Sequence, residues 1–133
     1  MKAETKSVLV VDSNESTLHT FNRLLKNRGF NVDEASKVEE ATGKMKSKNY
    51  DLVLVSSLLP DTEGIDLFLF GRESMPKAIE IVTKGLPFST EIVEAIDSGA
   101  DAVFAKPVAP GELLRVIEKI QESSRIHVLA RLE

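Results

Sequence analysis

The chain contains no cysteine and no tryptophan, and its only tyrosine is Tyr50. Without cysteine it forms no disulfide, no thiolate zinc site and no cysteine nucleophile. Aromatic residues make up 5% of the sequence, which is too few for a platform on which nucleic-acid bases stack. Basic residues are also in deficit, since 17 lysines and arginines face 21 aspartates and glutamates, for a net charge of −4. Direct nucleic-acid binding depends on clustered basic residues, so the composition argues against it.

Long hydrophobic runs are missing as well. No apolar run approaches the roughly 20 residues that a membrane span requires, and Val8–Val11 is too short for the apolar core of a signal peptide. We therefore expect a cytoplasmic protein without a membrane partner. The 133 residues, 42% of them apolar, suit one globular domain. We place this domain at residues 6–124, with residues 125–133 either extending the last helix or forming a stub.

Short apolar runs recur along the chain at regular intervals. Three of them are continuous and a fourth, Ala78–Val82, is broken only by Glu80; such runs are typical of strands that are buried on both faces of a parallel sheet. They are Val8–Val11, Leu52–Val55, Ala78–Val82 and Ala102–Ala105, and a weaker candidate strand lies at Phe30–Glu34.

The segments between these runs carry helical patterns, with apolar residues three and four positions apart. The repeats are Leu18/Phe21/Leu25, Val38/Ala41/Met45, Ile92/Val93/Ile96 and Leu113/Val116/Ile117/Ile120, and a short helix is predicted over Gly64–Glu73. Five strands that alternate with five helices predict an α/β fold, with helices on both faces of a doubly wound parallel sheet.

Ligands of such sheets bind at the carboxyl ends of the strands. The polar residues that follow the predicted strands are Asp12 and Ser13, Ser56, Thr83 and Lys84, and Lys106. We expect them to converge on one cleft that holds a carboxylate, hydroxyls and ammonium groups.

The order and spacing of several motifs are similar to those of response-regulator receiver domains of two-component signalling. The motifs are Val8–Asp12, Gly29–Ala35, Tyr50–Val55 with Pro60 and Gly64 beyond, Val82–Thr83, and Gly99–Asp101 leading to Lys106–Pro107. The resemblance implies a flavodoxin-like (βα)5 sheet in the order 2-1-3-4-5 and a cis peptide bond before Pro107. It also implies phosphorelay signal transduction with a protein partner, such as a histidine kinase, an output domain or another receiver. The oligomeric state stays open, with a homodimer among the alternatives.

The chain departs from the family at the site itself. The resemblance implies that an aspartate ending the third strand accepts the phosphoryl group, but Ser56 stands there. An acidic pair that holds magnesium is reduced to Asp12–Ser13, and Lys84 replaces a small residue. An aspartyl phosphate needs a carboxylate nucleophile, and Asp12 alone should bind magnesium weakly at most. We therefore expect no cofactor, no metal and no enzymatic activity.

These features predict a pseudo-receiver that acts through protein contacts, with Lys106 paired to Asp12. One alternative is a phosphate- or magnesium-responsive receiver with an altered site, using Asp12 with Ser56 or Ser57. Another is a small flavodoxin-like ligand-binding domain, although no glycine-rich phosphate loop or nucleophile elbow is present.

Each site residue also has a simpler interpretation. Asp12 could cap the first helix, Ser56 could fill space or make a hydrogen bond, and Thr83 could be an ordinary β-branched strand residue. Lys84 could be a solvated loop lysine. The pair Lys106–Pro107 would then be structural.

The predicted third helix has an excess of apolar residues for a surface helix. They are Ile65, Leu67, Phe68, Leu69 and Phe70. We interpret Phe68 and Phe70 as a partner surface, with a deeply seated helix or contact with the C-terminal tail as the alternatives. His19 and His127 are read as surface or half-buried residues without a metal, and Lys37–Lys48 as the solvated face of the second helix.

Overall fold

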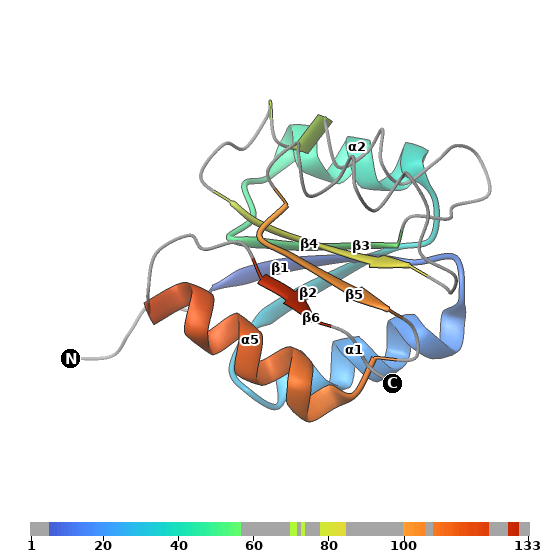
Figure 1. Ribbon diagram of the computed structural model, residues 1–133. Coiled ribbons are helices and arrows are strands. Elements are labelled where there is room, and N and C mark those ends of the chain that lie inside the picture. Colours follow the sequence, from blue (N-terminus) through green and yellow to red (C-terminus); the bar gives the residue numbers. More distant parts are fainter. Residues whose placement is uncertain are drawn as a thin grey trace.

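The fold was analysed in a computed structural model, which describes residues 6–56, 70, 71, 73, 78–84, 100–105, 108–122 and 128–130. Its elements (Figure 1) are β1 (Ser7–Val11), α1 (Glu15–Lys26), β2 (Asn31–Ala35), α2 (Val38–Ser47), β3 (Leu52–Ser56), β4 (Ile79–Lys84), β5 (Ala102–Ala105), α5 (Pro110–Glu122) and β6 (Val128–Ala130). The helix predicted from Ile92 lies outside the described residues. So does most of the one predicted over Gly64–Glu73, of which residues 70, 71 and 73 are helical.

The strands form one parallel sheet in the order β2-β1-β3-β4-β5-β6. Helices α1 and α5 cover one face of the sheet and α2 covers the other (Figure 1). This confirms the predicted flavodoxin-like α/β fold and the strand order 2-1-3-4-5. Parallel pairing brings the carboxyl ends of β1, β3, β4 and β5 to the same edge, where the candidate site residues lie.

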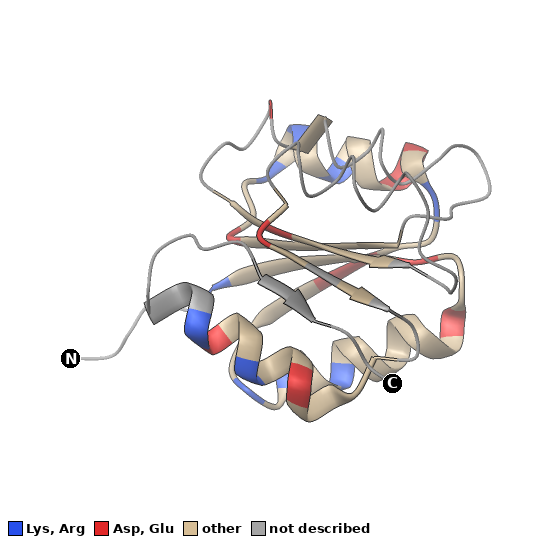
Figure 2. Cartoon of the chain, in the orientation of Figure 1, with Lys and Arg blue, Asp and Glu red and all other residues tan. Residues whose placement is uncertain are grey.

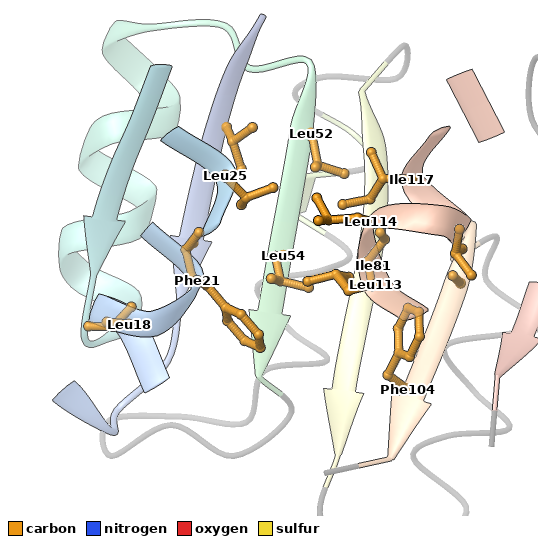
Figure 3. Close-up of a cluster of buried hydrophobic side chains, with 14 residues drawn as sticks. Leu18, Phe21, Leu25, Leu52, Leu54, Ile81, Phe104, Leu113, Leu114 and Ile117 are labelled. Atoms are coloured by element: carbon orange, nitrogen blue, oxygen red, sulfur yellow. The ribbon is translucent and has the colours of Figure 1, made fainter. Parts of the chain in front are cut away.

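The larger apolar cluster lies between the sheet and helices α1 and α5 (Figure 3). On α1, the repeat Leu18, Phe21 and Leu25 turns toward the sheet, as its spacing predicts. Phe104 of β5 is fully buried in the same cluster. This packing holds α1 against the sheet, and so places the start of α1 beside the end of β1.

The smaller cluster lies on the α2 side of the sheet. Ala41 and Met45 of α2 pack there with Val53 of β3 and with Tyr50. Phe70 is half buried and packs against this cluster. Phe70 therefore contributes to the core contacts, as in the alternative of a seated helix, and Phe68 lies outside the described residues.

The sheet has one strand more than the five predicted. Val128–Ala130 forms β6, which pairs in parallel with β5 and aligns Leu129 with Val103. Part of the segment 125–133 is thus neither a helical extension nor a stub. A run of three residues is too short to show a strand or helix period in sequence, which explains the difference.

Charged side chains cover the outer strand at the opposite edge. The Tyr50 hydroxyl donates a hydrogen bond to Asp33 Oδ2 at 2.7 Å, and Lys48 Nζ lies 3.2 Å from the same oxygen. The Tyr50 hydrogen bond, with help from Lys48, lowers the pKa of the Asp33 carboxyl. Burial and the Asp33 carboxylate raise the pKa of Tyr50. These contacts tie β2 to the chain segment that enters β3.

Replacing Leu25 by alanine should lower the free energy of unfolding by about 2–5 kcal/mol, because this side chain is fully buried in the larger cluster. Urea denaturation measures the loss. The control is R23A on the exposed side of the same helix, which should change the free energy by less than about 0.5 kcal/mol. Equal effects of the two substitutions would contradict the packing described here.

The Y50F variant should lose about 0.5–1.5 kcal/mol of stability near neutral pH, because it removes the hydrogen bond to Asp33. Since the folded-state pKa of Asp33 is lowered, its contribution is complete above the unfolded pKa of about 4. It is lost as the pH falls through the folded value. The stability difference between wild type and Y50F should therefore shrink in acid. A difference that is constant from pH 7 to the acid limit of folding would refute this assignment.

Candidate functional site

Three polar residues come together at the carboxyl edge of the sheet. Asp12 directly follows β1, Ser56 ends β3, and Thr83 lies near the end of β4. Ser56 and Thr83 are Cα partners in adjacent strands. Val11 and Val55 are partners too, so Asp12 lies level with Ser56. The sequence prediction that these residues meet is confirmed for these three positions.

Strand alternation puts the side chains of Ser56 and Thr83 on the α1/α5 side of the sheet. Leu54 and Ile81, each two positions before a site residue, belong to the larger apolar cluster on that side. Asp12, Ser56 and Thr83 are 2%, 3% and 1% exposed. They are therefore buried polar groups at the rim of the apolar core, where polar atoms need hydrogen-bond partners.

Phe104 and Thr83 are Cα partners in β5 and β4. Because Phe104 is packed in the larger cluster, the apolar core on the α1/α5 side reaches the level of Thr83.

Asp12 organises the loop that enters α1. Its backbone N–H donates to Ala35 O at 3.1 Å, and its Oδ1 accepts a hydrogen bond from the Asn14 N–H at 2.9 Å. Asn14 Oδ1 in turn accepts a hydrogen bond from the Thr17 N–H at 2.9 Å. The N-cap of α1 is therefore Asn14, and the alternative that Asp12 caps this helix was wrong.

A polar groove of about 340 Å3 lies beside the Asp12 loop. Its lining residues come from the start of α1, the end of β2 and the start of α2: Ser13, Glu15, Leu18, His19, Glu34, Ala35, Ser36 and Glu40. His19 Nδ1 lies 3.7 Å from Glu34 Oε2, and the His19 side chain is 66% exposed. This agrees with the interpretation of His19 as a surface residue. The described segments contain no group of three potential metal ligands.

Hydrogen bonds from Ser36 close the α2 side of this groove. The backbone N–H and the hydroxyl of Ser36 donate to Glu40 Oε1 at 2.9 and 2.7 Å. These bonds lower the pKa of the Glu40 carboxyl, with the backbone bond having the larger effect. The Glu40 carboxylate therefore stays ionised and fixes the turn between β2 and α2.

Several predicted site residues are not placed. Lys106, Pro107 and His127 lie outside the described residues, so the Asp12–Lys106 pair and the cis peptide bond stay predictions. Lys84 is the last residue of β4, which puts its backbone at the same edge as Thr83.

The residues that are placed do not fit the magnesium site that the family resemblance implies. Magnesium in such sites is bound by carboxylates together with phosphate oxygens and water. Here Asp12 brings a carboxylate, one oxygen of which accepts the Asn14 N–H, while Ser56 and Thr83 bring neutral hydroxyls. The described part of this site therefore offers a single carboxylate, fewer than the acidic set that the resemblance implies.

Sequence reasoning missed Asn14, Ser36 and Glu40 as residues that shape the loops around the site. The signal for Asn14 was available, because asparagine directly before an apolar-periodic segment is a preferred N-cap. Ser36 and Glu40, four positions apart at the start of a predicted helix, gave a similar signal.

No helix in the described part of the chain is long and apolar enough to cross a bilayer.

Comparison with known proteins identifies related sequences. A protein-family model of the response regulator receiver domain matches residues 8–118. The transcriptional regulatory protein ResD of Bacillus subtilis is 32% identical over 124 residues, which cover 92% of this chain and 50% of ResD. The cell cycle transcriptional regulator CtrA of Caulobacter vibrioides is 29% identical over 90% of this chain and 52% of CtrA. The chain thus spans about half the length of these curated relatives.

Solved structures that are similar to this chain include receiver domains as well. A CheY-like response regulator receiver domain protein from Methanospirillum hungatei matches with a TM-score of 0.86 and 28% identity, covering 90% of this chain and 96% of that one. A receiver domain of an HD domain-containing protein from Pseudomonas fluorescens matches with a TM-score of 0.84 and 26% identity, over 90% of this chain and 97% of that one.

The N14A variant should lower the free energy of unfolding by about 0.5–2 kcal/mol, because the first turn of α1 loses its side-chain acceptor for the Thr17 N–H. The matched variant N14D keeps an acceptor and should retain most of the stability. Chemical denaturation and the amide exchange rate of Thr17 measure both effects. If N14A and N14D behave alike, Asn14 is not the cap.

Proposed function

Because the chain belongs to the response regulator receiver domain family, we propose that it is a pseudo-receiver. It is a signalling module of a two-component system that keeps the receiver fold, does not accept a phosphoryl group on aspartate, and acts through protein contacts. The observation that carries the proposal is Ser56, which occupies the buried end of β3 beside Thr83.

The chemistry of the side chain at this position supports the proposal. A carboxylate attacks a phosphoryl donor directly and gives an acyl phosphate, whereas a serine hydroxyl needs a neighbouring general base. His19, the histidine of the described residues, is exposed on α1 and lies against Glu34. Asp12 already accepts the hydrogen bond that shapes its loop. Ser56 is therefore poorly equipped to replace the missing aspartate.

The charge of the site supports the same conclusion. With Ser13 and Ser56 at two of the positions where the resemblance implies carboxylates, Asp12 is the one carboxylate left at those positions, so the described part of the site has less like-charge repulsion for a cation to neutralise. We propose that the domain folds and works without bound magnesium.

Its partners then recognise a surface that phosphorylation does not alter. We propose a histidine kinase, an output domain or another receiver as the partner class, in the cytoplasm. ResD and CtrA are named as transcriptional regulators, and this chain spans about half of each. A link from this domain to transcription is therefore part of the proposal. Direct nucleic-acid contact by this domain is not proposed, since its net charge is −4.

The first test is an amide NMR titration with magnesium, followed by magnesium with beryllofluoride as a mimic of the phosphoryl group. The resonances of Asp12, Ser56 and Thr83 should stay in place through both additions, because the site lacks the carboxylates that would bind either species. Concerted shifts at low millimolar magnesium or below would show a working switch and would sink the proposal.

A gain-of-function variant tests the same assignment from the other side. The double substitution S13D/S56D restores two carboxylates, and with acetyl phosphate and magnesium it should gain one phosphoryl group by intact mass. The wild type should gain none. The matched control S13D/S57D adds the same charge one residue away and should stay unmodified. Labelling of the wild-type protein, on Ser56, Ser57 or elsewhere in this site, would favour an altered but active receiver. Far-UV circular dichroism verifies that the variants fold.

A further inference from the structure

Strand β6 lies beyond residues 8–118, the part of the chain that matches the receiver family model. It follows α5 and pairs in parallel with β5, so that Ala102, Val103 and Phe104 align with Val128, Leu129 and Ala130. It continues the sheet past β5 (Figure 1). Strand β5 is therefore an interior strand in this chain, and its outer row of backbone N–H and C=O groups has a partner strand.

The two edges of the sheet, at β2 and at β5, are protected against pairing with further strands in different ways. Edge strand β2 contains Asp33 and Glu34, and Lys44 Nζ donates a hydrogen bond to the backbone carbonyl of Glu34. Charges of this kind discourage another strand from pairing. Strand β5, Ala-Val-Phe-Ala, has no charged residue (Figure 2). A bare edge of this composition is prone to pair with a further strand, so its protection depends on β6.

We propose that the outer edge of β5 is a strand-accepting site that β6 of the same chain occupies, and that β6 of a second copy occupies it when the first strand leaves. The partner is thus a second copy of this chain, and the recognised element is the segment Val128–Ala130. This proposal concerns a surface outside the phosphorylation-site remnant and does not depend on the pseudo-receiver assignment.

Because β6 is short, its detachment from β5 should cost little free energy. A strand of three residues adds few ladder hydrogen bonds, and elements held by few hydrogen bonds open at a small free-energy cost. Within one chain, the connection from α5 keeps β6 at an effective concentration in roughly the millimolar range. Replacement by β6 of another copy reproduces the same pairing in the same register and needs no new contact. Exchange should therefore increase with protein concentration.

Cysteine pairs can trap this strand cleanly, because the chain has no native cysteine. Val103 and Leu129 are Cα partners, and adjacent strands lie about 4.8 Å apart, within the Cα separation of disulfides. The V103C/L129C variant, oxidised at low micromolar concentration, should form an intramolecular disulfide and stay monomeric on a non-reducing gel.

The matched control for this pairing is A102C/A130C. Ala102 aligns with Val128, so this pair is two residues out of register and about 8 Å apart by strand spacing and rise. It should close much less readily. Equal disulfide yields in the two variants would show that β6 is not held on β5 in this register, and would overturn the proposal.

Mixed single-cysteine chains test the exchange between copies. A V103C chain incubated with an L129C chain should give a heterodimeric disulfide whose yield rises with concentration. Adding L129P to the acceptor, as V103C/L129P, weakens its own β6 and should raise the yield several-fold at equal concentration. Absence of the heterodimer up to high micromolar concentration, or no gain from L129P in a variant that retains wild-type circular dichroism, would refute occupation by a second copy. If L129P fails to fold, the concentration dependence of the V103C and L129C mixture decides alone.

Discussion

Burial of the central strands on both faces is the constraint on which the rest of this domain depends. β1 and β3 lie between the two apolar clusters, and their residues are apolar along almost their whole length. Polar groups are too costly to desolvate within such strands unless they find partners. In β1 and β3 the first positions where polar side chains are tolerated are the strand ends, where Asp12 and Ser56 lie, and Thr83 of β4 lies at the same edge. The location of the site thus follows from the packing of the sheet, whatever chemistry the site performs.

The same constraint explains why serine suits the third-strand end of the proposed pseudo-receiver. A carboxylate at position 56 would be buried beside Asp12, and two buried carboxylates repel each other unless a cation intervenes. A hydroxyl can be satisfied by hydrogen bonds alone. The substitution therefore removes a reason for magnesium as well as the nucleophile. In the proposed pseudo-receiver the two losses are coupled by electrostatics, because with a neutral side chain at position 56 an acidic residue at position 13 would have no cation to hold.

Elements with a periodic apolar pattern could be predicted from the sequence. Single contacts between residues far apart in the chain could not. The spacing of Leu18, Phe21 and Leu25 revealed α1 and its buried face, because a helical period is a local property. The hydrogen bond between Tyr50 and Asp33 joins residues 17 positions apart, and no periodicity indicates such a pair. At the site, the convergence of Asp12, Ser56 and Thr83 followed from strand ends alone. The alternative that Asp12 caps α1 was wrong, because Asn14 is the cap; both residues precede the helix and both have a suitable side chain.

Strand β6 could not be predicted from sequence patterns, because its position depends on its pairing with β5. Residues 128–130 carry too little sequence to specify a strand, but the uncharged β5 offers an edge that a short apolar segment can satisfy. At the other end of the sheet, β2 carries acidic residues, and the nearby lysines bind its edge groups. Charged side chains protect the β2 edge, and strand β6 covers the β5 edge. A charged edge discourages strand pairing as long as its side chains are ionised, whereas a covering strand can leave. The two edges therefore differ in kind, and only the β5 edge can open without any change in the folded core.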